Sequence, residues 1–446
     1  LNKADKSNCR KGGLRLLSFK NSILKIERTT DGKSFGMLFE ICLYLCFALY
    51  FVFYKERVAT TASFAIGTAA TFFITVGKIK SSRLSVPIVT VWYLLFFAFA
   101  ELSAAWAYVP YTAAFTYIKQ MIFIIILGFG MCQYVDTHVD FERLLTIFQL
   151  ATLSLALSEL LFYPWQASSV NNYFGATVSG LNANSFSFLM MASAIIGFYK
   201  GYIRNKKLWY IPTLIFIICS FLSSSRKSAI MSLVGIMFII LFSFGKPRHI
   251  LHFILAFVVT VSVIFACIKI DFLYDIIGKR FESMINYYLD PSKAQTESSL
   301  LYRSYFIQFA KQLFYEKPAL GHGFSNFSIL LLTESAVNKW LYAHNNYWEI
   351  LADLGVVGFI LYYWFYAYLG IRSIIKLIKN RQSYTATLAI ALLGTLMIVE
   401  WGIVSMSYLF PQIVVVLIFT AVYDDDSSAQ KKYRYNQSSK GGRRIA

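Results

Sequence analysis

Residues 250–270 read ILHFILAFVVTVSVIFACIKI, a run with one lysine and no acidic side chain. A helix needs about 20 apolar residues to cross the roughly 30 Å hydrocarbon layer of a membrane, and this run has that length. Similar runs recur along the chain, which is 446 residues long, 57% hydrophobic and 15% charged. Soluble domains carry roughly a quarter of their residues as charged side chains. The sequence therefore predicts an integral membrane protein built from helices.

Twelve apolar runs are predicted to span the membrane, so the expected fold class is an all-α polytopic integral membrane protein with about 12 transmembrane helices. The basic segment before the first run lacks a cleavable signal, and that run is expected to act as an uncleaved signal anchor. The runs lie at 37–54, 58–77, 86–105, 111–133, 144–163, 185–200, 208–222, 229–245, 250–270, 347–370, 384–402 and 406–422.

The distribution of positive charge sets the expected orientation. Cytoplasmic loops are enriched in Lys and Arg, and placing both termini in the cytoplasm puts 29 of the 42 basic residues on that side. Topology then explains the net charge of +19, which argues against nucleic acid as a partner. The expected divisions are a basic cytoplasmic N-terminal tail at 1–36, transmembrane helices 1–9 at 37–270, a large extracytoplasmic loop at 271–346, transmembrane helices 10–12 at 347–422, and a cytoplasmic C-terminal tail at 423–446.

The extracytoplasmic loop is expected to contain an amphipathic helix. Apolar pairs recur every four residues from Leu301-Tyr302 to Leu313-Phe314, and this spacing places them along one face of a helix. The helix is expected to lie along the membrane surface or against the ends of the spans. It should end at Lys317-Pro318, before the flexible Gly321-His322-Gly323.

His344 stands at the end of this loop, directly before an apolar span. Histidine titrates near neutral pH, and at the outer edge of the membrane it can reach lipid-borne substrates. General acid or base catalysis is therefore one interpretation. A surface histidine that caps the next helix is the other.

His344-Asn345 is followed, after nine residues, by Gly355-Val356-Val357-Gly358. This pattern resembles the signature of the O-antigen ligase and O-antigen or capsular polysaccharide polymerase superfamily. Asp353 matches the acidic residue that this superfamily commonly has two positions before the first glycine. His322 has no match in the signature, so His344 is the expected catalytic histidine.

Further elements stand in the order that the same resemblance implies. The polar break SSSRKS at 223–228 is similar to the Ser-Arg element of these enzymes, with Lys227 where the family usually has a small residue. Arg303 matches the arginine at the start of the loop helix. Gly321-His322-Gly323 resembles the Gly-x-Gly turn between that helix and the histidine. Gly180–Asn184 is a weaker match to an earlier Asn-bearing element.

These residues suit the chemistry of a lipid-linked glycan. Guanidinium groups bind phosphate oxygens in a bidentate fork, and Arg226 and Arg303 could stabilise the charge that develops on a pyrophosphate as the sugar leaves. His344 would deprotonate or orient the acceptor hydroxyl, an effect typically worth about 10²–10⁴-fold. In the alternative interpretation, Arg226 anchors a helix at the lipid headgroups and Arg303 pairs with Glu297.

The resemblance implies an inverting, metal-independent glycosyltransferase without a cofactor, in the bacterial cytoplasmic (inner) membrane, with its active site facing outward. It implies that His344, Arg226 and Arg303 are catalytic. Residues expected to bind substrate are Asn345, Lys227, Gly321, Gly323 and Asp353. The expected partners are undecaprenyl-pyrophosphate-linked oligosaccharides and the lipid bilayer, with a chain-length regulator and a flippase as further candidates.

Polymerisation of lipid-linked repeat units into an O-antigen, capsule or exopolysaccharide is the favoured function. A ligase that transfers the glycan to lipid A core or protein is an alternative, because it would share these motifs. A polysaccharide transporter would account for the twelve spans and for intramembrane charges such as Glu400, but it leaves the ordered Arg226, Arg303 and His344 unexplained. A peptidoglycan polymerase would be expected to use a carboxylate where His344 stands.

Overall fold

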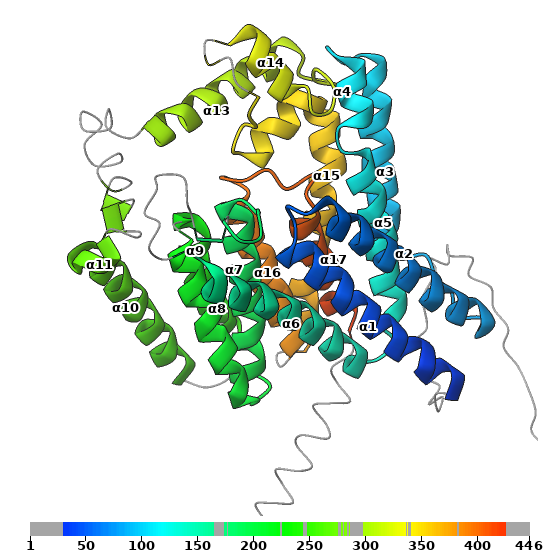
Figure 1. Cartoon of the computed structure of the whole chain (residues 1–446), viewed down its shortest axis with the longest axis vertical. Coiled ribbons are helices and arrows are strands. Elements are labelled where there is room, and N and C mark those ends of the chain that lie inside the picture. The colour runs from blue at the N-terminus through cyan, green and yellow to red at the C-terminus, as the bar shows by residue number, and fades with distance from the viewer. Residues whose placement is uncertain are drawn as a thin grey trace, which may run out of the picture.

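The computed structural model (Figure 1) describes residues 30–164, 174–175, 177–223, 225–243, 248–274, 278–279, 281–282, 285, 298–335, 337, 340–380 and 383–424. Within these ranges the regular structure is helical and no strand is present, which confirms the predicted all-α class. The helices are α1 (Thr30–Val52), α2 (Arg57–Lys80), α3 (Ile88–Leu102), η1 (Ser103–Ala105), α4 (Pro110–Phe115), α5 (Ile118–Tyr134), α6 (His138–Phe162), α7 (Ala183–Tyr202), η2 (Lys207–Trp209), α8 (Tyr210–Leu222), α9 (Arg226–Phe242), α10 (Arg248–Lys269), α11 (Asp271–Leu273), α13 (Ser298–Glu316), α14 (Phe327–Glu334), α15 (Asn346–Lys379), α16 (Tyr384–Val399) and α17 (Leu409–Tyr423).

Each predicted span overlaps one or more helices of the structure. In the part of the chain that is described, seven helices are long and apolar enough to cross a membrane, and four shorter apolar helices accompany them. The protein is therefore a multi-pass membrane protein. The count of twelve spans and the cytoplasmic location of both termini stay predictions, and most of the two predicted tails, residues 1–29 and 425–446, lies outside the described residues.

Two predicted spans differ from the structure in their interior. The run at 111–133 is divided into α4 and α5. The segment before α4 is bonded to the turn before α14: Tyr108 N donates to His322 O at 2.9 Å and Val109 N donates to Asn326 Oδ1 at 2.6 Å. The run at 347–370 belongs to α15, which is longer than predicted and is broken at Gly355.

The centre of the bundle is α17, in which every residue from Leu409 to Val422 is buried. Burial on all sides is typical of a helix surrounded by protein, and α5, α7, α15 and α16 all pack against it. The helix α10 lies at the rim of the bundle (Figure 1), with α9 as its main neighbour and most of its apolar side chains exposed. Such a surface is suited to contact with lipid.

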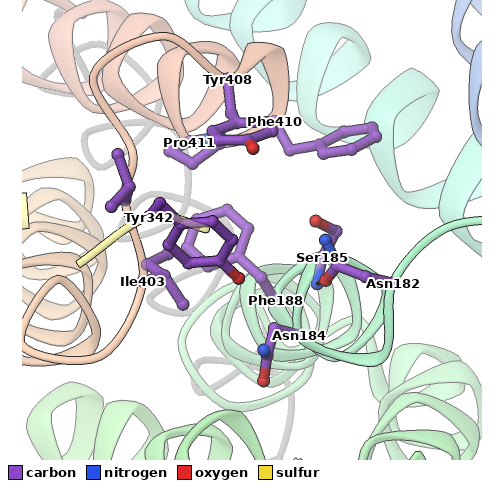
Figure 2. Close-up of a pocket in the computed structure, with 10 residues that line it drawn as sticks. Asn182, Asn184, Ser185, Phe188, Tyr342, Ile403, Tyr408, Phe410 and Pro411 are labelled. Carbon is purple, nitrogen blue, oxygen red and sulfur yellow. Dashed lines mark hydrogen bonds between the residues drawn. The ribbon is translucent and has the colours of Figure 1, made fainter. Parts of the chain in front are cut away.

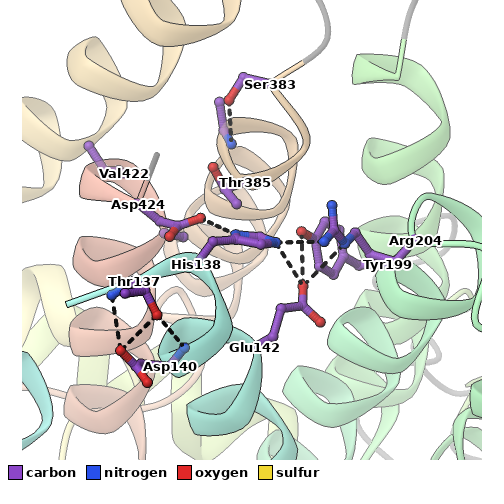
Figure 3. A network of polar contacts seen from close by, with 12 residues as sticks. Thr137, His138, Asp140, Glu142, Tyr199, Arg204, Ser383, Thr385, Val422 and Asp424 are labelled. Atoms are coloured by element: carbon purple, nitrogen blue, oxygen red, sulfur yellow. Dashed lines mark hydrogen bonds and ion pairs between the residues drawn. The ribbon is translucent and has the colours of Figure 1, made fainter. Parts of the chain in front are cut away.

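A polar network ties helices together at the end of the bundle remote from the loop (Figure 3). His138 Nδ1 lies 2.5 Å from Asp424 Oδ2, and His138 Nε2 lies 2.6 Å from an Arg204 guanidinium nitrogen. Glu142 pairs with Arg204 at 3.4 Å and with Lys206 at 3.1 Å. These contacts connect the start of α6 to the segment after α7 and to the end of α17.

Candidate functional site

The loop helix α13 has the apolar face that its sequence predicts. Phe306, Phe309, Ala310 and Leu313 are buried on that face and pack with residues of α14 and with Ala352 of α15. Arg303 precedes Phe306 by about one turn, so the two side chains project from the same side of the helix. The packing of α13 therefore also places Arg303.

The helix α15 is broken at Gly355, the first glycine of the histidine signature, and the residues after the break bond to the extracytoplasmic-loop segment predicted at 271–346. Gly355 has φ +62°, a left-handed conformation that glycine adopts without steric cost. Backbone groups freed by the break bond to the preceding turn: Val356 N donates to Pro318 O at 2.9 Å, and Val357 N donates to Ala319 O at 3.2 Å. A Cβ at Gly355 would collide with Ala319 O. The glycine is thus required both by the bend and by the close approach.

Gly321 and Gly323 complete this interlock from the other side. Both have positive φ, +67° and +100°. Gly323 N donates to Asp353 O at 2.8 Å, and a Cβ on Gly321 would collide with the Asp353 backbone. A Cβ on Gly323 would collide with Ala107, which follows η1. The structure therefore places these two predicted substrate-binding glycines at close contacts that join the loop to α15 and to the segment after η1.

Asp353 is fully buried and serves the same turn. Its Oδ2 accepts from Ser325 N at 2.8 Å and its Oδ1 accepts from Phe327 N at 2.7 Å. A carboxylate in this position satisfies backbone N–H groups at the start of α14 that have no partner within the helix. The geometry gives Asp353 a role in holding the loop, and its predicted contact with substrate stays a prediction.

His322 also belongs to the turn rather than to the His344 cluster. Its Nε2 lies 3.0 Å from Leu313 O, and its backbone N donates to Ala352 O at 3.0 Å. Burial lowers the pKa of the His322 imidazole from its ordinary value. The ring therefore contacts the end of α13, in a structural position.

The segment around His344 is fixed on both sides of the histidine. The Asn345 side chain caps α15 by accepting from Trp348 N at 3.1 Å, as Asn does at many helix starts. The buried Glu349 Oε2 accepts from Ala343 N at 2.6 Å. His344 itself has φ +54°, which is a strained conformation for any residue other than glycine. Strained conformations of this kind are often found at functional sites.

Two aromatic rings hold the half-buried imidazole of His344. Its centroid lies 4.1 Å from that of Tyr342 and 6.1 Å from that of Phe306, to which it is nearly parallel. Its Nδ1 is buried and has no hydrogen-bond partner among the described residues. Burial, followed by the charges of Arg303 and then Lys227, lowers the pKa of His344 to about 3. The imidazole is therefore neutral near pH 7.

The first turn of α9 approaches the same place. Lys227 lies against Gly402, where a Cβ would collide with its Nζ, and its charge acts on His344. Arg226 is the first residue of α9, but its side chain lies outside what the structure describes. Ser225 Oγ donates to Asn184 Oδ1 at 3.1 Å, which joins α9 to the start of α7.

A small pocket opens beside this cluster. Asn182 and Ser185 at the start of α7 lie across from Tyr408 and Phe410 at the start of α17 (Figure 2). Tyr342 lines the pocket and also contacts His344. The pocket and the His344 cluster therefore share a wall.

Glu400, a predicted intramembrane charge, is fully buried next to this region. It accepts hydrogen bonds from Tyr363 and Tyr366 at 2.9 and 3.0 Å and from Ser405 Oγ at 2.5 Å. Its backbone carbonyl accepts from Asn346 N at 2.9 Å. The carboxylate thus joins the segment between α16 and α17 to the later half of α15, and the carbonyl joins it to Asn346, two residues after His344.

The structure brings together His344, Arg303 and Lys227, from three elements that are distant in sequence. Asn345, Gly321, Gly323 and Asp353 instead hold the loop around them. Tyr342, Asn184 and Gly402 were missed as site residues. Asn184 lies in the weaker Asn-bearing match and Tyr342 stands two residues before His344, whereas no sequence signal points to Gly402.

Fold and site together define a polytopic all-α membrane protein with a neutral histidine set among cationic side chains at one end of the bundle. Residues 211–363 match the family model described as O-antigen ligase, a stretch that contains all eight predicted site residues. The chain is also 24% identical over 280 residues to a protein of Rickettsia felis named as a candidate polysaccharide ligase. That match covers 60% of this chain and 65% of the relative, just under two thirds of its length. The resemblance to the O-antigen ligase and polymerase superfamily is therefore confirmed, and both matches carry the ligase name while leaving the two branches unresolved.

Proposed function

We propose that this protein transfers a glycan from a polyprenyl pyrophosphate carrier, joining lipid-linked repeat units into a surface polysaccharide at the outer face of the cytoplasmic membrane. The observation that carries the proposal is that His344 contacts the ring of Phe306, one turn after Arg303 on α13, and that the charges of Arg303 and Lys227 act on its buried imidazole. Cations gathered beside a base are what a dianionic leaving group and a hydroxyl acceptor need in one place.

In the proposed reaction, the acceptor hydroxyl oxygen attacks the anomeric carbon of the donor sugar. His344 accepts the hydroxyl proton while the bond between the anomeric carbon and the pyrophosphate oxygen breaks. Arg303, Lys227 and Arg226 would stabilise the charge that grows on the departing polyprenyl pyrophosphate. Attack from the side opposite the leaving group inverts the anomeric centre.

The low pKa of His344 fits a base that acts only when the donor is bound. Burial and the charges of Arg303 and Lys227 disfavour the imidazolium. A bound pyrophosphate would offset both cations, and an opposite charge within a few ångströms favours the charged form of a base. Binding of the donor would therefore raise the proton affinity of His344 at the moment when a proton must be taken up.

A ligase is the second candidate, since both the family model and the Rickettsia felis relative carry the ligase name. The two functions use the same donor chemistry and differ in the acceptor. A polymerase adds the growing glycan to another lipid-linked repeat unit, whereas a ligase delivers it to a lipid A core or a protein.

Reconstitution of the purified protein in liposomes with lipid-linked repeat units separates the candidates. A polymerase forms a ladder of longer lipid-linked glycans from the donor alone. A ligase forms no ladder but consumes the donor when lipid A core or an acceptor protein is supplied. Transbilayer movement of intact donor without any new glycosidic bond would contradict the proposal, because it is the result expected of a transporter.

A further inference from the structure

The pocket between α7 and α17 has a lining unlike that of the His344 cluster. None of its ten described lining residues carries a charge. Five offer amide or hydroxyl groups, namely Asn182, Asn184, Ser185, Tyr342 and Tyr408. The others are apolar and include the rings of Phe188 and Phe410. A binding surface of this kind recognises a ligand with hydroxyl groups and apolar ring faces but no charge.

We propose that this pocket is a subsite for a sugar ring of the transferred glycan; the inference rests on the function proposed above. Amide and hydroxyl side chains donate to and accept from sugar hydroxyls, and aromatic rings pack against the C–H face of a pyranose.

Two other parts of a lipid-linked donor suit the pocket less well. The pyrophosphate would find no cation among the described lining residues, whereas Arg303 and Lys227 lie at His344. The prenyl tail would bury amide and hydroxyl groups without replacing the hydrogen bonds that these groups make to water, which is unfavourable. The sugar is therefore the part of the substrate that matches the lining.

Tyr342 connects the subsite to the reacting groups. Its ring centroid lies 4.1 Å from that of His344, and it lines the pocket together with Asn184. Asn184 in turn accepts from Ser225 Oγ at 3.1 Å, immediately before Arg226. A sugar ring bound here would lie beside the base and beside the start of α9, so the subsite would position a hydroxyl or an anomeric carbon for reaction.

Ser185→Leu tests the subsite, because Ser185 lines the pocket and a leucine side chain there would fill it. The hydrogen bond from the backbone N of residue 185 to the capping Asn182 side chain is kept in this variant. Ala183→Leu is the matched control, since it adds a leucine in the same turn of α7 away from the pocket lining. Two probes are compared by calorimetric binding to the detergent-solubilised full chain: sugar-free polyprenyl pyrophosphate, and the repeat-unit oligosaccharide without its pyrophosphate.

We expect Ser185→Leu to weaken oligosaccharide binding at least about tenfold, the loss of roughly one or two hydrogen bonds, and to leave binding of polyprenyl pyrophosphate within about twofold. Arg303→Lys should show the reverse. Equal weakening of both probes, or weakening of polyprenyl pyrophosphate alone, would overturn the subsite, because the pocket would then hold the carrier. Unchanged oligosaccharide binding would also overturn it. Failure of the wild-type protein to transfer glycan is a separate result that would contradict the proposed function, and these binding measurements do not depend on turnover.

Discussion

The protonation state of His344 is controlled by side chains from two other elements. Burial and the charges of Arg303 and Lys227 lower its pKa to about 3, well below the ordinary value near 6.5. Since a positive neighbour disfavours the imidazolium, removing one must raise the pKa. The loss of kcat/KM at acidic pH therefore reports the protonation of His344.

Lys227→Met should shift the loss of kcat/KM on acidification to higher pH, because the pKa of His344 in the free enzyme rises when one cation is removed. The pH dependence of kcat/KM reports ionisations of the free enzyme, so it is the parameter to measure. Lys207→Met removes an exposed lysine that follows the C-terminal end of α7 and should leave the profile unchanged. An acid limb that stays in place in Lys227→Met, or moves to lower pH, would contradict this electrostatic assignment.

Arg303→Lys separates charge from hydrogen-bonding geometry. Lysine keeps the positive charge, so the pH profile should change little, but it lacks the planar fork that binds two phosphate oxygens. We expect kcat/KM to fall about 10–100-fold, which corresponds to roughly 1.4–2.8 kcal/mol. Near-normal kcat/KM in this variant would mean that Arg303 does not contact the pyrophosphate.

At the scale of elements, α15 is divided at Gly355 and interlocked with the turn at 318–323. The half before the break carries Asn345 at its cap and follows His344 directly. The half after the break has the length of a membrane span. The break therefore connects the position of the histidine to the loop that packs on it.

Gly355→Ala should destabilise the protein by about 1–3 kcal/mol, because alanine is strained at φ +62° and its Cβ would meet Ala319 O. Transfer activity should fall with it, since the segment before the break carries His344. Gly370→Ala is the control within the same helix: its Cβ would lie 3.6 Å from Leu393 Cδ2, an ordinary contact. Denaturant unfolding in detergent measures both, and equal stability of the two variants would contradict the interlock.

Much of the architecture could be predicted from sequence because membrane spans and the α13 stripe depend on local apolar periodicity. The structural role of Asp353 could not, since both its partners, Ser325 N and Phe327 N, belong to a turn some 26–28 residues earlier. Lys227 was identified as a departure from the family pattern, but its approach to Gly402 depends on how α9 packs beside α16. Tyr342 has no motif of its own and is defined by its contact with His344.

At the scale of the whole molecule, the His344 cluster and the His138 network lie at opposite ends of the bundle. Tyr408 lines the pocket directly before α17, and Asp424 joins the network directly after it. The fifteen residues of α17 rise by about 1.5 Å each, which separates its ends by roughly 22 Å. The predicted topology places the cluster outside and the network in the cytoplasm.

Thiol labelling of intact cells tests this orientation. With Cys9 replaced by Ser, a cysteine at the exposed Thr333 of α14 should react with a membrane-impermeant reagent. A cysteine at the exposed Lys207 of η2 should react only after permeabilisation. The opposite pattern would invert the topology and place the His344 cluster away from the outer surface.

The most direct test is the initial rate of polyprenyl pyrophosphate release from lipid-linked repeat units, measured in liposomes for the wild-type protein and for His344→Gln. Glutamine keeps a polar side chain of similar size but cannot accept the acceptor proton, so its rate should be about 10²–10⁴-fold lower at an unchanged melting temperature. Release by the variant at a rate close to that of the wild-type protein would contradict the assignment of His344 as the base.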